Sequence, residues 1–280
     1  MTQIAVTGAT GAVGGEAARI LAGRKIDQRL LVRNPADAPD LPGATVVRSS
    51  YGDFETARNA LEGTTHLFMV SAAESADRME QHRTFIDAAA HAGVEHIVYT
   101  SFQGASPEAV FTLAHEHFET ERHIRASGLR WTFLRDSFYI DFLPMLAGDD
   151  GVIRGPAGDG RVAAVTRADV ARSAVAVLLD PAKHLDSTYT LTGPRAISMP
   201  EVARAVERHS GRPISFLDET IEEAYESRRK WNAPDWQNDA WVSTYTSIAA
   251  GEVSEVTGDV KAITGGDPES LDDFLSEAAP

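Results

Sequence analysis

The sequence predicts an α/β fold, in which a doubly wound parallel sheet carries a smaller α/β C-terminal portion. Three observations support this prediction. Short apolar runs alternate with helical patterns, a glycine-rich turn joins the first run to the first helical pattern, and this rhythm changes after Asp136. Strands that alternate with helices of about 10–20 residues are typical of βαβ units, and hence of a parallel sheet.

The first half of the chain supplies the elements of this sheet in order. The expected strands lie in the stretches QIAVTG, QRLLVRN, ATVVRSS, THLFMVS, HIVYTS and LRWTFLRD. The expected helices lie in GAVGGEAARILAG, DFETARNALEG, DRMEQHRTFIDAAAHAG and PEAVFTLAHEHFETERHIRASG. We therefore expect a dinucleotide-binding Rossmann-type domain over residues 1–150.

The second half predicts a smaller portion that builds a substrate site. Residues 150–165 have the pattern of a glycine-turned hairpin. Residues 166–180 predict an amphipathic helix, with Val170, Ala174, Val177 and Leu178 on one face. STYTLTG predicts a further strand and MPEVARAVERHSG a further helix. We expect residues 160–182 to return to the first domain and residues 183–280 to form the C-terminal portion, over the carboxyl edge of the sheet.

Composition excludes several classes of function. The 280 residues include no cysteine, which excludes disulfides, thiolate metal sites and cysteine nucleophiles. The formal net charge of −15 argues against a nucleic-acid surface, because such a surface needs a basic face. No stretch approaches the roughly 18 apolar residues of a membrane span. We expect a cytoplasmic protein with no metal site and no nucleic-acid or membrane partner; a homodimer is left open.

The glycine-rich turn is the first functional signal. VTGATGAVGG places Gly8, Gly11 and Gly14 at three-residue steps, directly after a strand and at the head of a helix. In that context the pattern indicates a diphosphate site, because side chains would keep the backbone amides away from the anion. The alternative is a tight turn that happens to be rich in glycine.

Arg33 is the second signal. It follows the second expected strand, where an NAD-binding site often carries an acid that binds the adenosine ribose. An arginine there pairs with a 2′-phosphate, which a carboxylate would repel. NADP(H) is therefore favoured over NAD(H), which stays open, as does the alternative that Arg33 is an ordinary surface residue.

Together with two later stretches, the turn resembles a known family. VTGATGAVGG, GVEHIVYTSFQGAS and LAHEHFETERHIRASGLRWTFLRDSFYIDFLP are similar to the NmrA-like atypical short-chain dehydrogenases, and most of all to their NADPH-dependent quinone oxidoreductases and triphenylmethane reductases. The resemblance runs from Thr2 to about Leu179. It implies a Rossmann-type fold, a bound dinucleotide, and either reductase activity or redox sensing.

The resemblance also implies which residues contact the dinucleotide. Around the pyrophosphate it places Gly8, Thr10, Gly11, Ala12 and Val13. On the adenosine side it places Arg33 at the 2′-phosphate and Asp53 near the adenine. Along the riboses and the nicotinamide it places Met69, Val70, Ser71, Thr100, Ser101 and Phe102, and it places Phe138 and Tyr139 at the border of the substrate cavity.

One departure from the wider dehydrogenase pattern bears on the chemistry. Ordinary short-chain dehydrogenases use a Tyr-x-x-x-Lys pair, whose positions here carry Leu113 and His117. Without a phenol as general acid, reduction of a simple ketone is disfavoured, because the alkoxide product is strongly basic. A quinone or a cationic dye gives a weakly basic product and needs no such donor, although Tyr139 could substitute for the missing tyrosine.

Three residues are therefore candidates for a role near the reacting atoms. His117 could hold the nicotinamide ribose or relay a proton, or it could be a structural partner of Glu121 one turn later. Ser101 could bond a substrate oxygen or cap a turn. Tyr139 could donate a proton.

The sequence predicts an NAD(P)H-dependent reductase of quinone-like or other conjugated aromatic acceptors. A redox sensor that binds dinucleotide without turnover and regulates a partner protein is the alternative. A nucleotide-sugar epimerase is disfavoured because it depends on the tyrosine–lysine pair. Trp231, Trp236 and Trp241 could form a lid over a flat substrate or belong to the core of the C-terminal portion.

Overall fold

The structure, a computed structural model, describes residues 3–277. The chain divides into two compact units. Within the described residues, the first unit comprises residues 3–101, 117–135 and 168–189. The second unit comprises residues 102–116, 136–167 and 190–277.

A seven-stranded sheet forms the centre of the α/β fold, as predicted. Its strand order is β3–β2–β1–β4–β5–β6–β9, and the pairs β3–β2, β2–β1, β1–β4 and β4–β5 are parallel. This order is that of a doubly wound dinucleotide-binding sheet. The strands are β1 Ile4–Thr7, β2 Gln28–Val32, β3 Ala44–Arg48, β4 His66–Met69, β5 His96–Phe102, β6 Arg130–Asp136 and β9 Ser187–Leu191.

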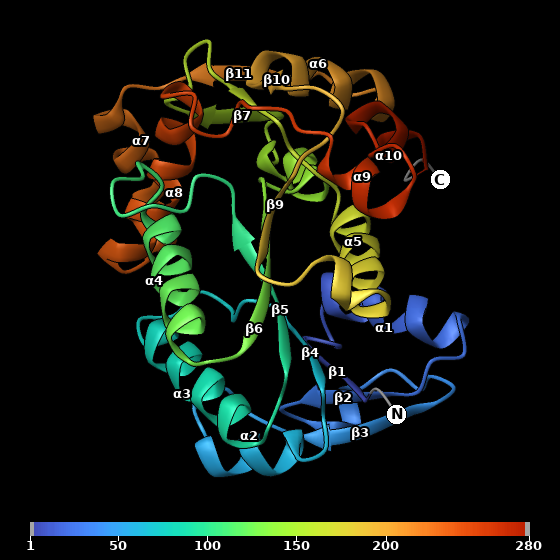
Figure 1. The fold of residues 1–280 in the computed structure, drawn as a ribbon. Coiled ribbons are helices and arrows are strands. Elements are labelled where there is room, and N and C mark those ends of the chain that lie inside the picture. Colours follow the sequence, from blue (N-terminus) through green and yellow to red (C-terminus); the bar gives the residue numbers. More distant parts are fainter. Residues whose placement is uncertain (1–2, 278–280) are drawn as a thin grey trace. The chain divides into compact units, whose positions relative to one another are not determined.

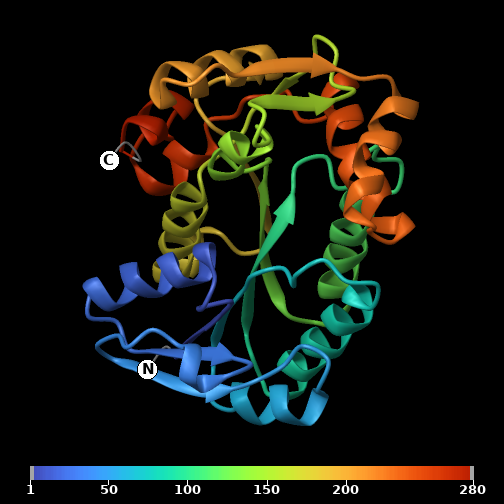
Figure 2. The same cartoon turned by 180° about the vertical axis from the view of Figure 1, so that it is seen from behind.

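Helices cover both faces of this sheet. Figures 1 and 2 show α1 and α5 on one face and α2, α3 and α4 on the other. Strands covered on both faces are buried along their whole length, and β1 and β5 are buried at every position. The helices are α1 Ala12–Gly23, α2 Phe54–Leu61, α3 Arg78–His91, α4 Thr112–Ala126 and α5 Arg167–Leu179, with short 3₁₀ turns η1 Pro35–Asp37 and η3 Pro181–Lys183.

The amphipathic pattern predicted for α5 is confirmed. Val170, Ala174, Val177 and Leu178 are all buried. Their spacing of three and four residues places them on one face of the helix. Ala171, Ser173 and Val175 are buried as well, so the covered part of α5 is wider than this face.

The second unit contains two small sheets. β7 (Val152–Gly155) pairs in parallel with β11 (Ser215–Asp218), and β8 (Arg161–Val162) pairs antiparallel with β10 (Ile197–Ser198). The remaining elements are η2 Ile140–Leu146, α6 Met199–Ser210, α7 Ile221–Arg228, η4 Arg229–Trp231, α8 Asp235–Ala249, α9 Asp259–Thr264 and α10 Leu271–Glu277.

The predicted hairpin over residues 150–165 is therefore wrong, because β7 and β8 pair with other strands. Its glycines serve close packing instead. A Cβ on Gly155 would lie 2.3 Å from Cγ of Tyr245, and a Cβ on Gly160 would lie 2.2 Å from the carbonyl oxygen of Ile248. Both partners lie on α8, so the glycines let this helix approach the chain.

The tryptophans of the second unit are not its deepest residues. Trp231 is 57% exposed, and it meets the partly buried Trp241 edge to face at 5.4 Å between ring centroids. Trp236 is also only partly buried. The buried aromatic residue of α8 is Tyr245, so the core of the unit does not depend on the three indole rings.

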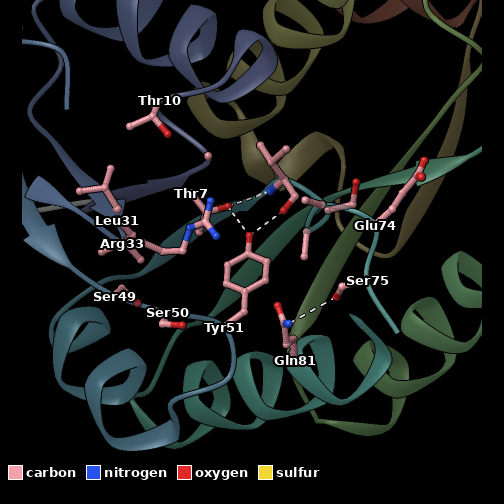
Figure 3. A pocket seen from close by; sticks show the side chains of 16 residues that line it. Thr7, Thr10, Leu31, Arg33, Ser49, Ser50, Tyr51, Glu74, Ser75 and Gln81 are labelled. Carbon is pink, nitrogen blue, oxygen red and sulfur yellow. Dashed lines mark hydrogen bonds between the residues drawn. The ribbon is translucent and has the colours of Figure 1, made fainter. Parts of the chain in front are cut away.

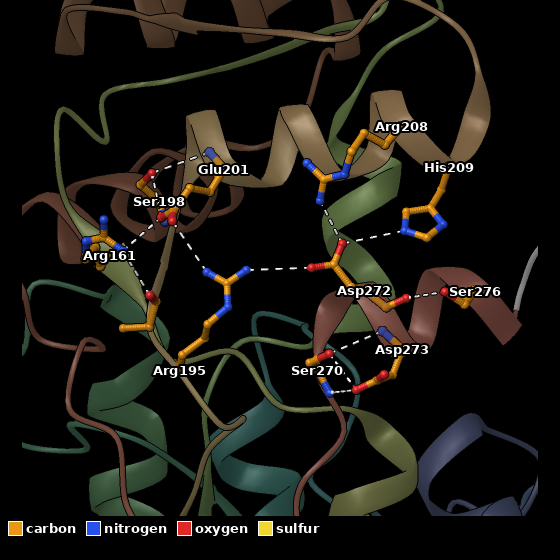
Figure 4. Close-up of polar contacts among 11 residues, drawn as sticks. Arg161, Arg195, Ser198, Glu201, Arg208, His209, Ser270, Asp272, Asp273 and Ser276 are labelled. Carbon is orange, nitrogen blue, oxygen red and sulfur yellow. Dashed lines mark hydrogen bonds and ion pairs between the residues drawn. The ribbon is translucent and has the colours of Figure 1, made fainter.

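Exposed ion pairs connect α6 with α10 and with β8 in the second unit (Figure 4). Arg208 on α6 pairs with Asp272 on α10 at 2.8 Å, and Arg161 on β8 pairs with Glu201 on α6 at 2.8 Å. Arg195 lies 3.4 Å from Glu201 and 3.8 Å from Asp272. Exposed pairs of this kind contribute little each, about 1 kcal/mol or less.

Candidate functional site: a cavity at the carboxyl ends of the strands

The first unit has a cavity of about 360 Å³ where β1, β2, β3 and β4 end. Open parallel sheets bind their ligands at this edge. Figure 3 shows the cavity with its lining side chains, among them Thr7, Arg33 and Tyr51. The lining residues are Thr7, Gly8, Thr10, Leu31, Val32, Arg33, Ser49, Ser50, Tyr51, Val70, Ser71, Ala72, Ala73, Glu74, Ser75 and Gln81.

The glycine-rich turn forms one side of the cavity. Gly8 has a φ of +64°, and a Cβ there would lie 3.2 Å from Cβ of Val70. A Cβ on Gly14 would lie 2.4 Å from the carbonyl oxygen of Thr7, so only glycine lets α1 begin this close to β1. These two glycines set the backbone path between β1 and α1.

The start of α1 has the features of an anion site. Gly11 is the N-cap and makes no side-chain capping bond, so Ala12, Val13 and the next residue begin the helix without a side-chain acceptor from the N-cap. The helix dipole places partial positive charge at the same end. Of the residues predicted around a pyrophosphate, Gly8 and Thr10 line the cavity, and Gly11, Ala12 and Val13 form this helix start.

Arg33 and Ser49 lie side by side at the ends of two adjacent strands. Val32 and Arg48 are register partners of β2 and β3, and the Ser49 N–H donates to the Val32 carbonyl at 2.8 Å. Among residues 3–277 Arg33 makes no ion pair or side-chain hydrogen bond, and the buried Ser49 Oγ has no hydrogen-bond partner. The cavity wall thus offers an uncompensated cation and an unpartnered hydroxyl.

The carboxylate of Asp53 caps a helix. Asp53 is the N-cap of α2, where its carboxylate accepts from the Thr56 N–H at 3.0 Å and from the Thr56 hydroxyl at 2.6 Å. These hydrogen bonds lower the pKa of the Asp53 carboxyl. Asp53 is not among the residues that line the cavity.

The segment after β4 forms the opposite wall. Met69 is fully buried in the core beneath it, whereas Val70 and Ser71 line the cavity. The Ser71 N–H donates to Oγ1 of the buried Thr100 at 2.8 Å, and the Val70 N–H donates to Thr7 Oγ1 at 2.9 Å. Of the predicted ribose contacts, the structure brings Val70 and Ser71 to the cavity and places Thr100 behind Ser71.

Tyr51 is a cavity residue that sequence reasoning missed. Its hydroxyl lies 2.6 Å from both Thr7 Oγ1 and the Val70 carbonyl oxygen, and its ring stacks on Phe85 with centroids 4.3 Å apart. Burial raises the pKa of the Tyr51 phenol well above 10, so it is neutral. Its position three residues after β3, at the same edge as Arg33, is the signal that could have found it.

His117 is buried, and both of its ring nitrogens have partners. Nε2 lies 3.1 Å from an Arg78 guanidinium nitrogen, and Nδ1 lies 2.9 Å from the Tyr99 hydroxyl. A guanidinium only donates, so Nε2 is the acceptor and Nδ1 carries the proton. Burial, with the charge of Arg78 beside it, lowers the pKa of His117 well below 6.5, so the ring is neutral.

Ser101 and Glu121 belong to a second buried network. The Ser101 hydroxyl donates to Glu121 Oε1 at 2.6 Å. Arg135 donates to both carboxylate oxygens, at 2.8 and 2.7 Å, and Arg125 lies 3.3 Å from Oε2. Glu121 and Ser101 are both fully buried. The Ser101 proton is thus directed at a carboxylate inside the first unit.

The second unit contains Phe102, predicted near the nicotinamide, Leu113 at the position of the missing tyrosine, and Phe138 and Tyr139, predicted at the border of the substrate cavity. The ring of Phe102 lies 5.0 Å from that of Phe138, and the Leu113 side chain is buried in the same hydrophobic cluster. Tyr139 donates to Asp136 Oδ2 at 2.6 Å, and the Arg167 guanidinium lies over its ring at 4.9 Å. Burial, together with the negative charge of Asp136, raises the pKa of the Tyr139 phenol well above 10.

Two searches over the described part of the chain were negative. Within residues 3–277, no group of His, Asp or Glu side chains is arranged to hold a metal ion. In the same residues, none of the helices combines the length and the apolar character that crossing a membrane requires.

Comparisons with known proteins find relatives along nearly the whole chain. Residues 1–230 match the profile of the NmrA-like family. An NAD(P)H azoreductase of Xenophilus azovorans is 31% identical over 283 residues, which cover 99% of this chain and 98% of the relative.

Two solved structures are similar over nearly the full length. The NADPH-dependent quinone oxidoreductase of Escherichia coli, in complex with NADPH, has a TM-score of 0.88 and 32% identity over 98% of this chain and 99% of its own. The triphenylmethane reductase of Citrobacter sp. has a TM-score of 0.87 and 30% identity, and 99% of each chain is covered.

Proposed function

Because the chain belongs to the NmrA-like family, we propose that it is an NAD(P)H-dependent reductase of quinone-like or other conjugated aromatic acceptors, with NADPH as the preferred donor. The observation that carries this proposal is the cavity of the first unit. It combines the uncapped N-terminus of α1 with Arg33, a cation that has no ion-pair partner within residues 3–277.

The residues of the cavity fit a phosphorylated dinucleotide. The turn from Gly8 to Val13 would hold the diphosphate, because it presents backbone amides and the positive end of the α1 dipole. Arg33 would pair with the 2′-phosphate of the adenosine, with the Ser49 hydroxyl beside it. Val70 and Ser71 would border the riboses. The Asp53 carboxylate keeps its bonds to Thr56, and its contact with the adenine stays a prediction.

The class of acceptor follows from the proton donors of the chain. A bound reduced dinucleotide supplies a hydride to the acceptor. Leu113, at the position of the usual tyrosine, offers no proton. Tyr139 keeps its proton, because burial and Asp136 raise its pKa well above 10. Acceptors whose reduced form is a weak base, and takes its remaining proton from water, therefore fit this chain better than simple ketones.

The three residues predicted near the reacting atoms differ in the role that their hydrogen bonds leave them. We propose that His117 acts by holding Arg78, because both of its ring nitrogens are already bonded. Ser101 donates to Glu121 and would need to break a 2.6 Å bond to donate to a substrate. Tyr139 would border the acceptor, together with the neighbouring Phe138.

The test is anaerobic mixing of the protein with NADPH and a panel of quinones, azo dyes and triphenylmethane dyes. We expect the absorbance of the reduced nicotinamide to fall with several of these acceptors and not with simple aliphatic ketones. Tight binding of NADPH with no turnover on the whole panel would instead favour a redox sensor. No binding of either nicotinamide dinucleotide would overturn both functions.

A further inference from the structure

The wall of the cavity after β4 is held by side chains from several elements. Three consecutive backbone N–H groups each donate to a side chain. The Val70 N–H donates to Thr7 Oγ1 at 2.9 Å, the Ser71 N–H to Thr100 Oγ1 at 2.8 Å, and the Ala72 N–H to His82 Nε2 at 2.9 Å. A loop segment with its amides bound in this way has its conformation fixed before a ligand arrives.

Ala72 is held on both sides by α3. Its carbonyl oxygen accepts from Arg78 Nε at 3.0 Å, while its N–H donates to His82. Gln81, on the same helix, reaches the Ser75 hydroxyl at 3.5 Å, a contact that Figure 3 shows at the edge of the cavity. α3 thus contacts the cavity wall through three side chains.

The protonation state of His82 follows from these partners. A backbone N–H only donates, so Nε2 is the acceptor, and Nδ1 carries the proton and donates to Thr120 Oγ1 at 2.9 Å. Burial, with a further contribution from the Arg78 charge, lowers the pKa of His82 to about 3. The ring therefore stays neutral, in one tautomer, at any pH used for an assay.

Arg78 is buried and oriented in turn by α4. Its guanidinium donates to His117 Nε2 at 3.1 Å, and His117 donates from Nδ1 to Tyr99 at 2.9 Å. Arg78 is 4% exposed and His82 is fully buried. Polar groups this deep are costly unless each has a partner, so their retention beside the cavity needs an explanation beyond packing.

We propose that Arg78 and His82 are positioning residues for dinucleotide binding, which hold Ala72, and with it the wall from Val70 to Ser75, in the conformation that accepts the ligand. This inference rests on the proposed function of the cavity. Neither side chain lines the cavity itself. Both act through the backbone of Ala72, whose neighbours Ala73, Glu74 and Ser75 line it.

The expected loss of NADPH affinity depends on how often the wall from Val70 to Ser75 adopts its binding conformation. If removing one of the hydrogen bonds to Ala72 leaves the wall in its binding conformation about a tenth of the time, the apparent affinity falls about tenfold. The maximal rate should change far less than the KM for NADPH, because the wall is ordered again once the ligand is bound.

The test compares His82→Leu with His82→Gln. Both variants lose the bond to Thr120, but the glutamine oxygen can still accept from Ala72 near the position of Nε2. We expect H82L to raise the Kd for NADPH about tenfold and H82Q to restore most of the affinity. Fluorescence titration gives Kd, steady-state kinetics give KM and kcat, and calorimetry gives the melting temperature.

His96→Leu is the matched control. His96 is also buried and bonded to a threonine, Thr132, at 2.9 Å, but it begins β5, at the opposite edge of the sheet from the cavity. H96L should lower the melting temperature without raising the Kd. If H82L does not fold, Thr120→Val, which removes the partner of Nδ1, should raise the Kd several-fold.

Two results would overturn the inference while leaving the proposed function intact. One is a wild-type protein that binds NADPH together with an H82L variant of equal affinity. The other is an H96L variant that loses affinity as much as H82L does. Failure of the wild-type protein itself to bind NADPH would instead count against the proposed function.

Discussion

Two polar regions of the first unit differ in how far their hydrogen bonds are satisfied. At the cavity, the start of α1 has no side-chain cap and Arg33 has no ion-pair partner within residues 3–277. Around Glu121, the fully buried carboxylate accepts from Ser101, Arg125 and Arg135. Groups left open in a folded protein are available to a ligand, whereas satisfied buried groups hold the fold together.

We call the start of α1 and Arg33 the open region, and the buried hydrogen bonds around Glu121 the closed network. Substitutions in the open region should change dinucleotide affinity and leave the free energy of unfolding nearly unchanged. Substitutions in the closed network should lower the free energy of unfolding and leave dinucleotide affinity nearly unchanged. The His82 and Arg78 contacts lie between these extremes, because they are satisfied groups that act on the wall of the open region.

The largest expected effect on stability is that of Glu121→Gln. Removing the charge leaves Arg135 without its bidentate carboxylate, and breaking a buried pair typically costs about 3–5 kcal/mol. Because the Arg135 side chain is 24% exposed, we expect a loss nearer about 3 kcal/mol in urea unfolding. The NADPH affinity of the folded variant should be retained.

The control for this variant is Glu119→Gln. Glu119 is on the same helix and pairs with Arg122, but that pair is exposed. Its loss should cost less than about 1 kcal/mol. Equal losses in E119Q and E121Q, or a large loss of NADPH affinity in E121Q alone, would remove the distinction between the two regions.

Arg33→Glu should have the largest effect on binding. It replaces the cation beside Ser49 with a charge that repels a 2′-phosphate, so NADPH affinity should fall about 100-fold, the equivalent of about 2.7 kcal/mol. NADH affinity should be kept or improved. Isothermal titration with both dinucleotides measures the change in preference.

Arg24→Glu carries the same change of charge at the other end of α1, where the residue is exposed and outside the cavity. It should leave the preference for NADPH over NADH unchanged. If R33E weakens both dinucleotides equally, Arg33 does not contact the 2′-phosphate, and the open region has lost its specificity element.

The residues of the open region could be picked out from the sequence because each belongs to a short pattern of neighbouring residues. Gly8 and Gly14 are needed by the backbone path of a single turn, and Arg33 directly follows a strand, so both could be read without tertiary contacts. The strand and helix order of the first unit was predicted for the same reason. The face of α5 was predicted from its periodicity and is buried as expected.

The hydrogen bonds of the buried histidines could not be predicted from the sequence, because their partners lie far apart along the chain. His82 bonds Thr120 and the Ala72 backbone, and His117 bonds Arg78 and Tyr99. No spacing rule relates such residues. The hairpin prediction failed for a related reason, since Gly155 and Gly160 meet side-chain and backbone atoms of α8, which follows them by some distance in the chain.

The last prediction concerns the acid stability that the buried His96 confers. Burial, with His66 beside it, lowers the pKa of His96 from 6.5 to about 4. The unfolded chain therefore binds one more proton than the folded chain between these two values. The stabilising contribution of neutral His96 is complete above pH 6.5 and is lost as the pH falls toward about 4.

Each such histidine should add about 1.4 kcal/mol per pH unit to the slope of unfolding free energy in that window. His96→Gln, measured by urea unfolding at several pH values from 7 downward, should remove this part of the slope. If H96Q keeps the wild-type slope, His96 does not titrate on unfolding, and burial alone does not keep histidines such as His82 neutral.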